Sequence, residues 1–138
     1  MAIALFPGSF DPFTTGHEAI LRRVLPLFDK VVVAVGVNSD KKYMFTVEER
    51  MARIREMLND CPTVEVTSYS GMTVDLCHRL GAKVIIRGIR TAKDFDYEQT
   101  IAAVNRLQDP SIETLLLLAD PEHVDSSSTL EREKLSHQ

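Results

Sequence analysis

The sequence has few of the features that mark membrane, secreted or nucleic-acid-binding proteins. No apolar run approaches the roughly twenty residues that a helix needs to cross a bilayer. The first residues lack the basic start, the apolar stretch and the cleavage site of a secretory signal. The formal net charge of −4 at pH 7 disfavours a nucleic-acid-binding surface, which is normally basic. We therefore expect a cytoplasmic protein that binds neither membrane nor nucleic acid.

Cysteine is also scarce. Cys61 and Cys77 are the only two, and their spacing matches no metal-binding or redox motif. No internal repeat, low-complexity stretch or linker interrupts the 138 residues, a length that suits one domain with a sizeable core. We expect a single domain spanning residues 1–138 in a reduced setting.

Strand and helix patterns alternate along the chain. Residues 31–37 form a nearly continuous apolar run, as in a parallel strand covered on both faces. Thr46 and Glu49 have the spacing of a helix capping box, and Gly81 is typical of a helix end. Strands are predicted at residues 3–6, 31–37, 63–67, 83–86 and 112–118, and helical stripes at Ile20, Val24, Leu27 and Phe28, at Met51, Ile54 and Leu58, at Val74, Cys77 and Leu80, and at Tyr97, Ile101 and Val104. This order predicts an α/β fold, a Rossmann-like doubly wound five-stranded parallel sheet with helices on both faces.

The segment from Pro7 to His17, which reads P-G-S-F-D-P-F-T-T-G-H, is the most informative part of the sequence. It is a glycine-bearing turn between a short strand and a helix, and such a turn leaves backbone N–H groups available to an anion. His17 follows the turn and can donate a hydrogen bond as charge develops on a phosphate. The segment predicts a phosphate-binding site with a catalytic imidazole.

Polar loops follow four of the predicted strands, at residues 7–17, 38–42, 87–90 and 123–129. In a doubly wound sheet, ligands bind outside the carboxyl ends of the strands, near the switch in strand order. The four loops should therefore lie together and contact one set of ligands. A local cluster of Lys and Arg is enough to bind phosphates there, whatever the net charge of the chain.

The motifs in these loops resemble those of the bacterial phosphopantetheine adenylyltransferases, a family of the nucleotidylyltransferase superfamily. Thr14-x-Gly16-His17 matches the superfamily's H/T-x-G-H signature, and G-S-F-D-P before it is typical of the family. The segments R-G-I-R at 87–90, D-F-D-Y-E at 94–98 and N-R at 105–106 match as well, and residues 127–133 resemble a further family element. The similarity runs from residue 3 to about residue 133.

The resemblance implies a reaction and its participants. The family joins ATP and 4′-phosphopantetheine to give dephospho-coenzyme A and pyrophosphate in coenzyme A biosynthesis, and it uses Mg²⁺, which we expect on the triphosphate. The acceptor phosphate attacks directly, so the protein aligns the reactants and stabilises charge without a covalent intermediate. Family members assemble as hexamers and are commonly inhibited by coenzyme A. A homo-oligomer and a feedback inhibitor are therefore expected.

The resemblance also implies roles for individual residues. His17, Lys41 and Arg90 would be catalytic, with His17 hydrogen-bonding the α-phosphate and Lys41 bridging it to the attacking phosphate. The expected ATP-binding residues are Ser9, Phe10, His17, Gly88, Ile89, Arg90, Glu98, His123, Val124, Asp125, Ser126, Ser127, Ser128 and Thr129. The expected acceptor-binding residues are Ser9, Lys41, Met72, Thr73, Arg87 and Asn105. No protein-held metal site is expected.

Simpler interpretations exist for several of these residues. A histidine after a turn is more often a helix cap or a surface residue, and Lys41 could be an ordinary solvated loop residue. Glu98 could pair with a nearby arginine instead of a ligand. An arginine that ends a buried strand, such as Arg87, needs an anion to face. For His17 the surrounding motif favours the functional interpretation.

The C-terminal end departs from the family pattern. Ser126, preceded by Asp125, stands where the family has an aliphatic residue, and a carboxylate there would repel a triphosphate unless offset. Glu131 stands at a normally apolar position, and family members usually continue for another helix after the point where this chain ends at Gln138. We expect a shortened or missing C-terminal helix.

Two other functions stay open on the sequence alone. One is a related nucleotidylyltransferase with a different phosphorylated acceptor, such as a nicotinamide or glycerol phosphate, although R-G-I-R and the Tyr97-Glu98 pair argue against it. The other is a nucleotide- or coenzyme-A-binding module without turnover, which would bind ligands and release no pyrophosphate.

Overall fold

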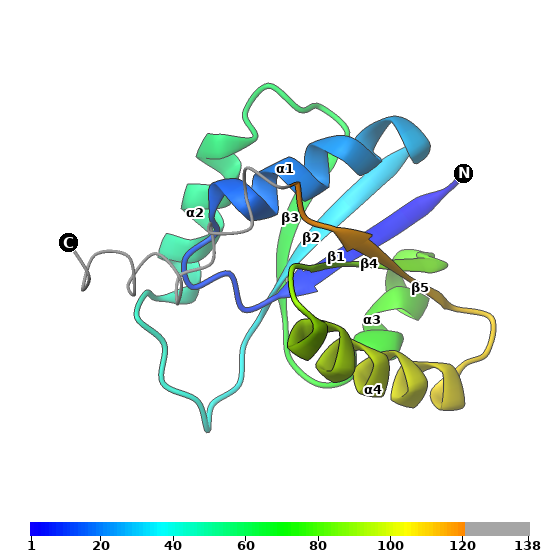
Figure 1. Ribbon diagram of the computed structural model, residues 1–138. Coiled ribbons are helices and arrows are strands. Elements are labelled where there is room, and N and C mark those ends of the chain that lie inside the picture. Colours follow the sequence, from blue (N-terminus) through cyan, green and yellow to red (C-terminus); the bar gives the residue numbers. More distant parts are fainter. Residues whose placement is uncertain (121–138) are drawn as a thin grey trace.

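Parallel strands and helices alternate along the part of the chain that the computed structural model describes, residues 1–120 (Figure 1). The strands are β1 (Ile3–Gly8), β2 (Lys30–Gly36), β3 (Val64–Tyr69), β4 (Val84–Ile89) and β5 (Glu113–Leu118). The helices are α1 (Thr15–Val24), α2 (Val47–Met57), α3 (Thr73–Leu80) and α4 (Ala92–Gln108), with a short 3₁₀ helix η1 (Leu25–Leu27) after α1. Every strand and helix predicted from the sequence is present, with ends that differ by a few residues.

The five strands form one sheet in the order β3-β2-β1-β4-β5, and each neighbouring pair is parallel. The chain winds outward from β1 to β3 and then returns to the other side of β1 with β4. The winding direction therefore reverses between β1 and β4, which confirms the predicted doubly wound sheet. The turns that follow these two strands lie at the position where such sheets bind ligands.

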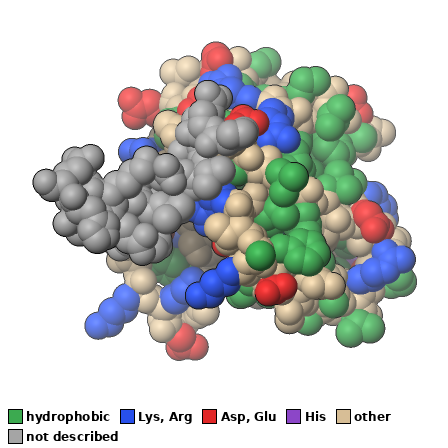
Figure 2. All heavy atoms as spheres, in the orientation of Figure 1, with side chains coloured by type: hydrophobic (Ala, Val, Ile, Leu, Met, Phe, Trp, Pro, Cys, Tyr) green, Lys and Arg blue, Asp and Glu red, His purple; other side chains and the backbone are tan. Residues whose placement is uncertain are grey.

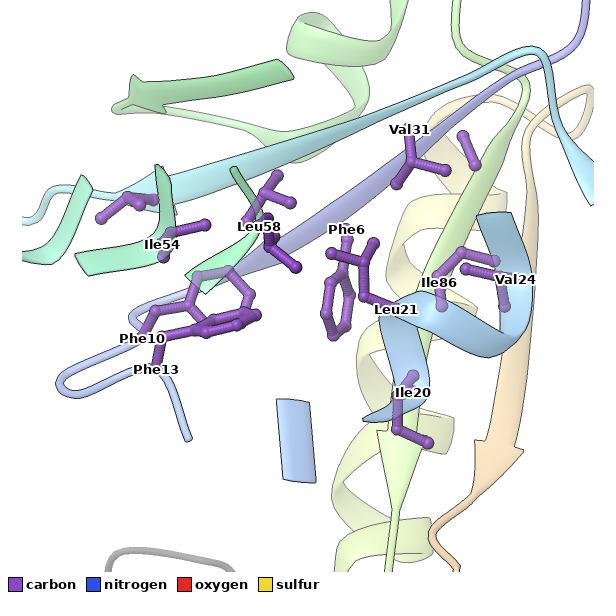
Figure 3. Packing of buried hydrophobic residues seen from close by; sticks show 13 residues of the cluster. Phe6, Phe10, Phe13, Ile20, Leu21, Val24, Val31, Ile54, Leu58 and Ile86 are labelled. Atoms are coloured by element: carbon purple, nitrogen blue, oxygen red, sulfur yellow. The ribbon is translucent and has the colours of Figure 1, made fainter. Parts of the chain in front are cut away.

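Alternate side chains of the central strands bury two apolar layers. Val31, Val33 and Val35 pack on one face with the aromatic side chains of the β1–α1 turn and with α1 and α2, part of which Figure 3 shows. Val32 and Ala34 pack on the opposite face, where α3 contributes buried side chains. Because residues of a strand alternate between faces, the continuous run at 31–37 serves both layers. Helices cover both faces, as predicted.

The predicted helix boundaries at Thr46 and Gly81 are found. Thr46 N–H donates to Glu49 Oε1 at 3.0 Å, and Glu49 N–H donates to Thr46 Oγ1 at 3.1 Å, which is a reciprocal capping box at the start of α2. Gly81 ends α3 with a φ of 72°, in the left-handed region that glycine adopts without strain. Each boundary follows from the chemistry of a few neighbouring residues.

The stripe predicted on α1 is confirmed at Ile20, Val24 and Phe28 and wrong at Leu27, and the stripe predicted on α4 is wrong. Leu27 is 69% exposed because α1 ends at Val24 and the chain continues as η1. On α4, Ile101 and Val104 are 39% and 47% exposed, while the buried residues of this helix are polar. The reason is that the polar side of α4 faces the end of β4, where an arginine pairs with it. Figure 2 shows hydrophobic side chains gathered on the right of the view, where β5 and α4 lie in Figure 1.

The longest described helix, α4, has 17 residues. Among the helices of residues 1–120, none combines the length and the apolar character needed to cross a membrane.

Candidate active site

Two adjoining cavities open at the carboxyl edge of the sheet. The first cavity, of about 370 Å³, is lined by the β1–α1 turn, the end of β4 and the start of α4. The second cavity, of about 840 Å³, is lined by the ends of β1, β2 and β3 and by α4. Both are lined by Gly8, Ser9, Arg87, Tyr97 and Glu98, which form a shared wall. Groups bound in the two cavities would meet beside these residues.

The turn after β1 forms one side of the first cavity. Phe10 has a φ of 48°, a conformation that few residues other than glycine adopt. Its ring lies over Gly8, where an added Cβ would stand only 2.9 Å from Phe10 Cζ, so a larger residue at this position would displace the ring. The Phe10 ring packs edge-on against the His17 ring at 5.1 Å between centroids, and Phe13 stacks on His17 at 5.4 Å. Two aromatic rings therefore fix the imidazole plane.

Helix α1 begins with a capping box in which His17 takes the place usually held by glutamate or glutamine. His17 N–H donates to Thr14 Oγ1 at 3.3 Å, and Thr14 N–H donates to His17 Nδ1 at 2.9 Å. Because Nδ1 accepts this bond, the proton of the neutral ring lies on Nε2. His17 is thus both a helix cap and a lining residue of the first cavity, with Nε2–H available as a donor.

The electrostatic surroundings keep this imidazole neutral. Burial, together with the positive charges of Arg90 and Arg87, lowers the pKa of His17 from 6.5 to about 4. At pH 7 the ring therefore carries a proton on Nε2 alone and can donate a hydrogen bond without changing its ionisation state.

Arg87 occupies the shared wall and is held there by Glu98. Arg87 Nε donates to Glu98 Oε2 at 2.8 Å, Nη2 donates to Oε1 at 2.7 Å, and Nη1 donates to the Pro7 carbonyl. Glu98 is 5% exposed, whereas 28% of the Arg87 side chain remains exposed. The anion that a strand-end arginine needs is Glu98, which is the alternative pairing that the sequence left open. Both Glu98 oxygens face Arg87, so the described structure gives no separate support to the expected adenosine contact.

Arg90 is anchored at the start of α4. Its backbone N–H and its Nε donate to Asp94 Oδ2 at 3.0 and 3.2 Å. Asp94 N–H in turn donates to the Thr91 side chain, which caps α4. These bonds hold Arg90 where it lines the first cavity, which His17 also lines.

The second cavity has a polar lining from three segments. Asn38, Ser39 and Lys41 come from the loop after β2, and Asn105 comes from α4, where it is 8% exposed. Thr73 lies at the start of α3, and its hydroxyl is 3.1 Å from the Tyr69 hydroxyl. An extended polar ligand with an amide-rich arm would find hydrogen-bonding partners along this surface.

The carboxylates that line the first cavity are engaged with the protein. Asp11 accepts from the N–H groups of Met44 and Phe45 at 2.6 and 2.9 Å, Asp94 pairs with Arg90, and Glu98 pairs with Arg87. Within residues 1–120, no group of three or more His, Cys, Asp or Glu residues could hold a metal ion.

Most of the predicted site residues that the structure describes lie around these cavities. The first cavity gathers Ser9, Phe10, His17, Arg87, Gly88, Arg90 and Glu98, and the second gathers Ser9, Lys41, Thr73, Arg87, Glu98 and Asn105. Ile89 is buried and Met72 is 46% exposed at the cap of α3, and neither lines these cavities, so their roles stay predictions. Residues His123, Val124, Asp125, Ser126, Ser127, Ser128 and Thr129 lie outside the described part of the chain.

Sequence reasoning assigned no role to several residues of the site, although three of them belong to the motifs that it quoted. Tyr97 and Gly8 belong to the shared wall, Asp94 anchors Arg90, and Tyr43 lines the second cavity. The position of Asp94 four residues after Arg90 is the i, i+4 spacing of a helical ion pair and could have indicated it. For Tyr43 no comparable local signal exists.

A family model described as cytidylyltransferase-like matches residues 5–134, which places the chain in that class. The doubly wound sheet and its two cavities at the switch point agree with this class. Among solved structures, a bifunctional NMN adenylyltransferase/ADP ribose pyrophosphatase from Francisella tularensis aligns with a TM-score of 0.68 and 19% identity, over 99% of this chain and 42% of that one. A lipopolysaccharide core biosynthesis protein from Thermoplasma volcanium aligns with a TM-score of 0.58 and 22% identity, over 87% of this chain and 97% of that one. At these identities the likeness concerns the fold.

Curated relatives narrow the class. The phosphopantetheine adenylyltransferase of Leuconostoc citreum is 52% identical over 133 residues, which cover 96% of this chain and 84% of the relative. That of Flavobacterium psychrophilum is 48% identical over 133 residues, with 96% and 87% covered. The chain belongs to the phosphopantetheine adenylyltransferase family. The resemblance found in the sequence motifs is thereby confirmed.

Proposed function

We propose that the chain transfers the adenylyl group of ATP to 4′-phosphopantetheine, giving dephospho-coenzyme A and pyrophosphate in coenzyme A biosynthesis. The observation that supports this most is the shared wall, where Ser9 and Arg87 line a cavity containing His17 and a cavity containing Lys41. A reaction between two phosphates needs both held in one geometry, and two cavities that meet at phosphate-binding side chains provide it.

The transfer needs no protein nucleophile. A phosphate oxygen of the acceptor forms a bond to the α-phosphorus of ATP, while the bond from that phosphorus to the oxygen bridging to the β-phosphate breaks. Pyrophosphate leaves with the electron pair of the broken bond, so atoms and charges balance without a covalent intermediate or an external proton acceptor. Catalysis then consists of alignment and of stabilising charge on the transferred group.

In this reaction His17 donates from Nε2 to an oxygen of the α-phosphate. Its proton stays on the ring, because the lowered pKa and the bond at Nδ1 keep one neutral tautomer. Removing one such preorganised donor typically lowers the rate by about 10²–10³-fold. Ser9, in the shared wall, contacts the phosphates where the two substrates meet.

The cationic side chains divide between the substrates. Arg87 and Lys41 bind the acceptor phosphate, and Lys41 also reaches the α-phosphate as a compact ammonium. Arg90 binds the phosphates of ATP from the first cavity. Thr73 and Asn105 hydrogen-bond the pantetheine arm in the second cavity.

Mg²⁺ enters this proposal as part of the nucleotide. We place the ion on the phosphates of ATP, because Mg²⁺ is usually bound by substrate phosphates and water with only one or two carboxylates. Its contribution there is to neutralise part of the triphosphate charge. The groups of the protein act on the phosphate oxygens themselves.

The direct test measures pyrophosphate release from Mg·ATP with and without 4′-phosphopantetheine. We expect release that depends on the acceptor and falls by about 10²–10³-fold in His17→Gln. Nicotinamide and glycerol phosphates serve as competing acceptors. Release with one of them and not with 4′-phosphopantetheine would overturn the assignment of the acceptor. Binding of ATP and coenzyme A without release would overturn the enzymatic assignment.

Self-association is part of the proposal. We infer a homo-oligomer, with a hexamer as the expected state, supported by the exposed apolar side chains of α4 and β5: Tyr97, Ile101, Val104, Leu107, Leu115 and Leu118. Val104→Glu should lower the molar mass in sedimentation velocity, whereas Leu27→Glu, at an exposed site elsewhere, should not. A monomeric parent chain would overturn the inferred self-association.

Inhibition by coenzyme A is expected from competition at the second cavity and is measured as a rise in KM for the acceptor.

A further inference from the structure

Arg50 of α2 is a buried cation that lines neither of the two cavities. The residue is 2% exposed. Its Nη1 donates to the carbonyls of Ser9 at 2.9 Å and Gly36 at 3.1 Å, and its Nε donates to the Thr46 carbonyl at 3.4 Å. Burying a guanidinium is unfavourable unless it finds acceptors, and here carbonyl oxygens from three segments accept from its Nη1 and Nε groups. The side chain therefore joins the turn after β1, the end of β2 and the start of α2.

The same guanidinium lies over the ring of Tyr43. Arg50 Cζ lies 4.0 Å from the centroid of the Tyr43 ring, within the range of a cation–π contact. The Tyr43 hydroxyl accepts a hydrogen bond from Asn38 N–H at 3.0 Å, and Lys41 N–H donates to the Asn38 carbonyl at 3.0 Å. Lys41 Nζ is 5.9 Å from the centroid of the same ring. Tyr43 thus connects Arg50 to the loop that carries Lys41.

We propose that Arg50 and Tyr43 form a brace that sets the position of Ser9, in the shared wall, relative to Lys41, in the second cavity. The inference rests on the proposed adenylyl transfer, in which Ser9 and Lys41 contact the two phosphates. Arg50 is a positioning residue, because it acts through the Ser9 carbonyl and the Tyr43 ring. The brace therefore couples the position of a residue in the shared wall to the position of a residue in the second cavity.

The brace requires arginine at position 50. A guanidinium offers several donors in fixed directions and a flat face for stacking, whereas a lysine ammonium is a compact charge on a flexible stem. Arg50→Lys therefore keeps the positive charge and loses the simultaneous contacts to Ser9, Gly36 and Tyr43. This variant therefore tests whether the contacts of the guanidinium matter, because its positive charge is unchanged.

Other contacts hold the same loops when the brace is broken. The Asp11 carboxylate accepts from the N–H groups of Met44 and Phe45, and Arg53 Nε donates to the Phe13 carbonyl at 2.8 Å. The fold of the turn after β1 therefore does not depend on Arg50 alone. Tyr43 lies half-buried in a loop, so its variants are expected to fold.

The test compares the parent chain with Arg50→Lys, Tyr43→Phe and Tyr43→Leu. The control is Arg55→Lys, on the exposed side of the same helix. Initial rates give kcat and both KM values, and calorimetry gives the Kd of ATP and of 4′-phosphopantetheine, all well below the lowest unfolding temperature. Arg50→Lys should lower kcat on the order of 10²-fold, the effect of about 1 Å of misplacement. Arg55→Lys should behave as the parent.

The Tyr43 variants provide a readout that general loosening would not produce. Tyr43→Leu should raise the Kd of 4′-phosphopantetheine by roughly tenfold, equivalent to one good hydrogen bond, and leave the Kd of ATP within about twofold. Tyr43→Phe keeps the stacked ring and should lie between Tyr43→Leu and the parent.

Two results would overturn the brace: an Arg50→Lys kcat close to that of the parent, or a Tyr43→Leu loss that is equal for both ligands. If the parent itself releases no pyrophosphate, the proposed function fails, and the Kd values then decide the brace. A selective loss of acceptor binding in Tyr43→Leu would still support it, and unchanged binding would overturn it. If Arg50→Lys does not fold, the Tyr43 variants decide in the same way.

Discussion

Arg87 and Glu98 meet through two hydrogen bonds of 2.8 and 2.7 Å in the wall that both cavities share. The pair joins the end of β4 to α4 and fixes the direction of the guanidinium. Since both oxygens of Glu98 face Arg87, the carboxylate influences a bound ligand chiefly through the arginine. This pairing also explains why α4 turns its polar residues toward the sheet.

Glu98→Gln should weaken acceptor binding more than ATP binding. The amide N–H₂ that replaces one oxygen faces guanidinium donors and cannot accept from them. We expect KM for 4′-phosphopantetheine to rise roughly tenfold, from the loss of one charged hydrogen bond that orients Arg87. Initial rates of pyrophosphate release measure both KM values. A rise confined to the KM for ATP would favour a direct contact with adenosine, and Glu113→Gln, in an exposed pair with Arg106, is the matched control.

Substitutions of His17 should separate its two roles. Glutamine at this position can accept the bond from Thr14 N–H, so His17→Gln should preserve the start of α1. His17→Ala lacks that bond and should lower the free energy of unfolding by about 1 kcal/mol more. Both variants should lose turnover by about 10²–10³-fold with ATP affinity nearly unchanged. If His17→Gln turned over at the rate of the parent, His17 would act only as a helix cap and not as a donor in catalysis.

The lowered pKa of His17 should make stability depend on pH. The pKa is about 4 in the folded chain against an ordinary value of 6.5. Between these values the unfolded chain binds a proton that the folded chain does not. As far as His17 determines it, the free energy of unfolding is therefore highest above pH 6.5, falls as the pH drops toward 4, and levels off below pH 4. Urea titrations should show a smaller fall for His17→Gln over this interval, and equal falls in the two proteins would contradict a buried neutral imidazole.

Gly8→Ala should damage the turn after β1. The new methyl group would stand 2.9 Å from the Phe10 ring, which packs against His17, so the ring and the imidazole must shift. We expect a loss of about 1–3 kcal/mol in the free energy of unfolding, as for other overpacked sites, and reduced turnover. Gly36→Ala is the comparison, because its Cβ would meet its nearest neighbour at 3.7 Å, an ordinary contact. Equal losses in the two variants would contradict the steric argument.

The fold was largely predictable because short-range chemistry determines its elements. The capping pair Thr46–Glu49, the left-handed Gly81 and the apolar run at 31–37 each depend on a few neighbouring residues, and each prediction is confirmed. The orientation of α4 was not predictable in the same way. An apolar stripe predicts the buried side of a helix only when no charged partner competes, and Arg87 competes for Glu98.

Site residues that lie in a sequence motif could be predicted. Residues whose role depends on contacts between distant segments could not. His17 follows a turn whose sequence indicates anion binding. Arg50, by contrast, lies in a helix rich in charged residues, R-M-A-R-I-R, and the pattern predicts a solvated side chain. Its burial depends on the carbonyls of Ser9, in the turn after β1, and of Gly36, at the end of β2. No local pattern contains that information.

The bond from Thr14 N–H to His17 Nδ1 has a consequence for the reversibility of the reaction. With that nitrogen occupied, the imidazole exchanges no proton while the adenylyl group moves. In the proposed mechanism the same neutral Nε2–H then faces an oxygen of the α-phosphate, whether the adenylyl group departs from ATP or from dephospho-coenzyme A. The chain should therefore make ATP from its product and pyrophosphate in the same ionisation state, so that net flux depends on pyrophosphate removal and not on reprotonation of His17.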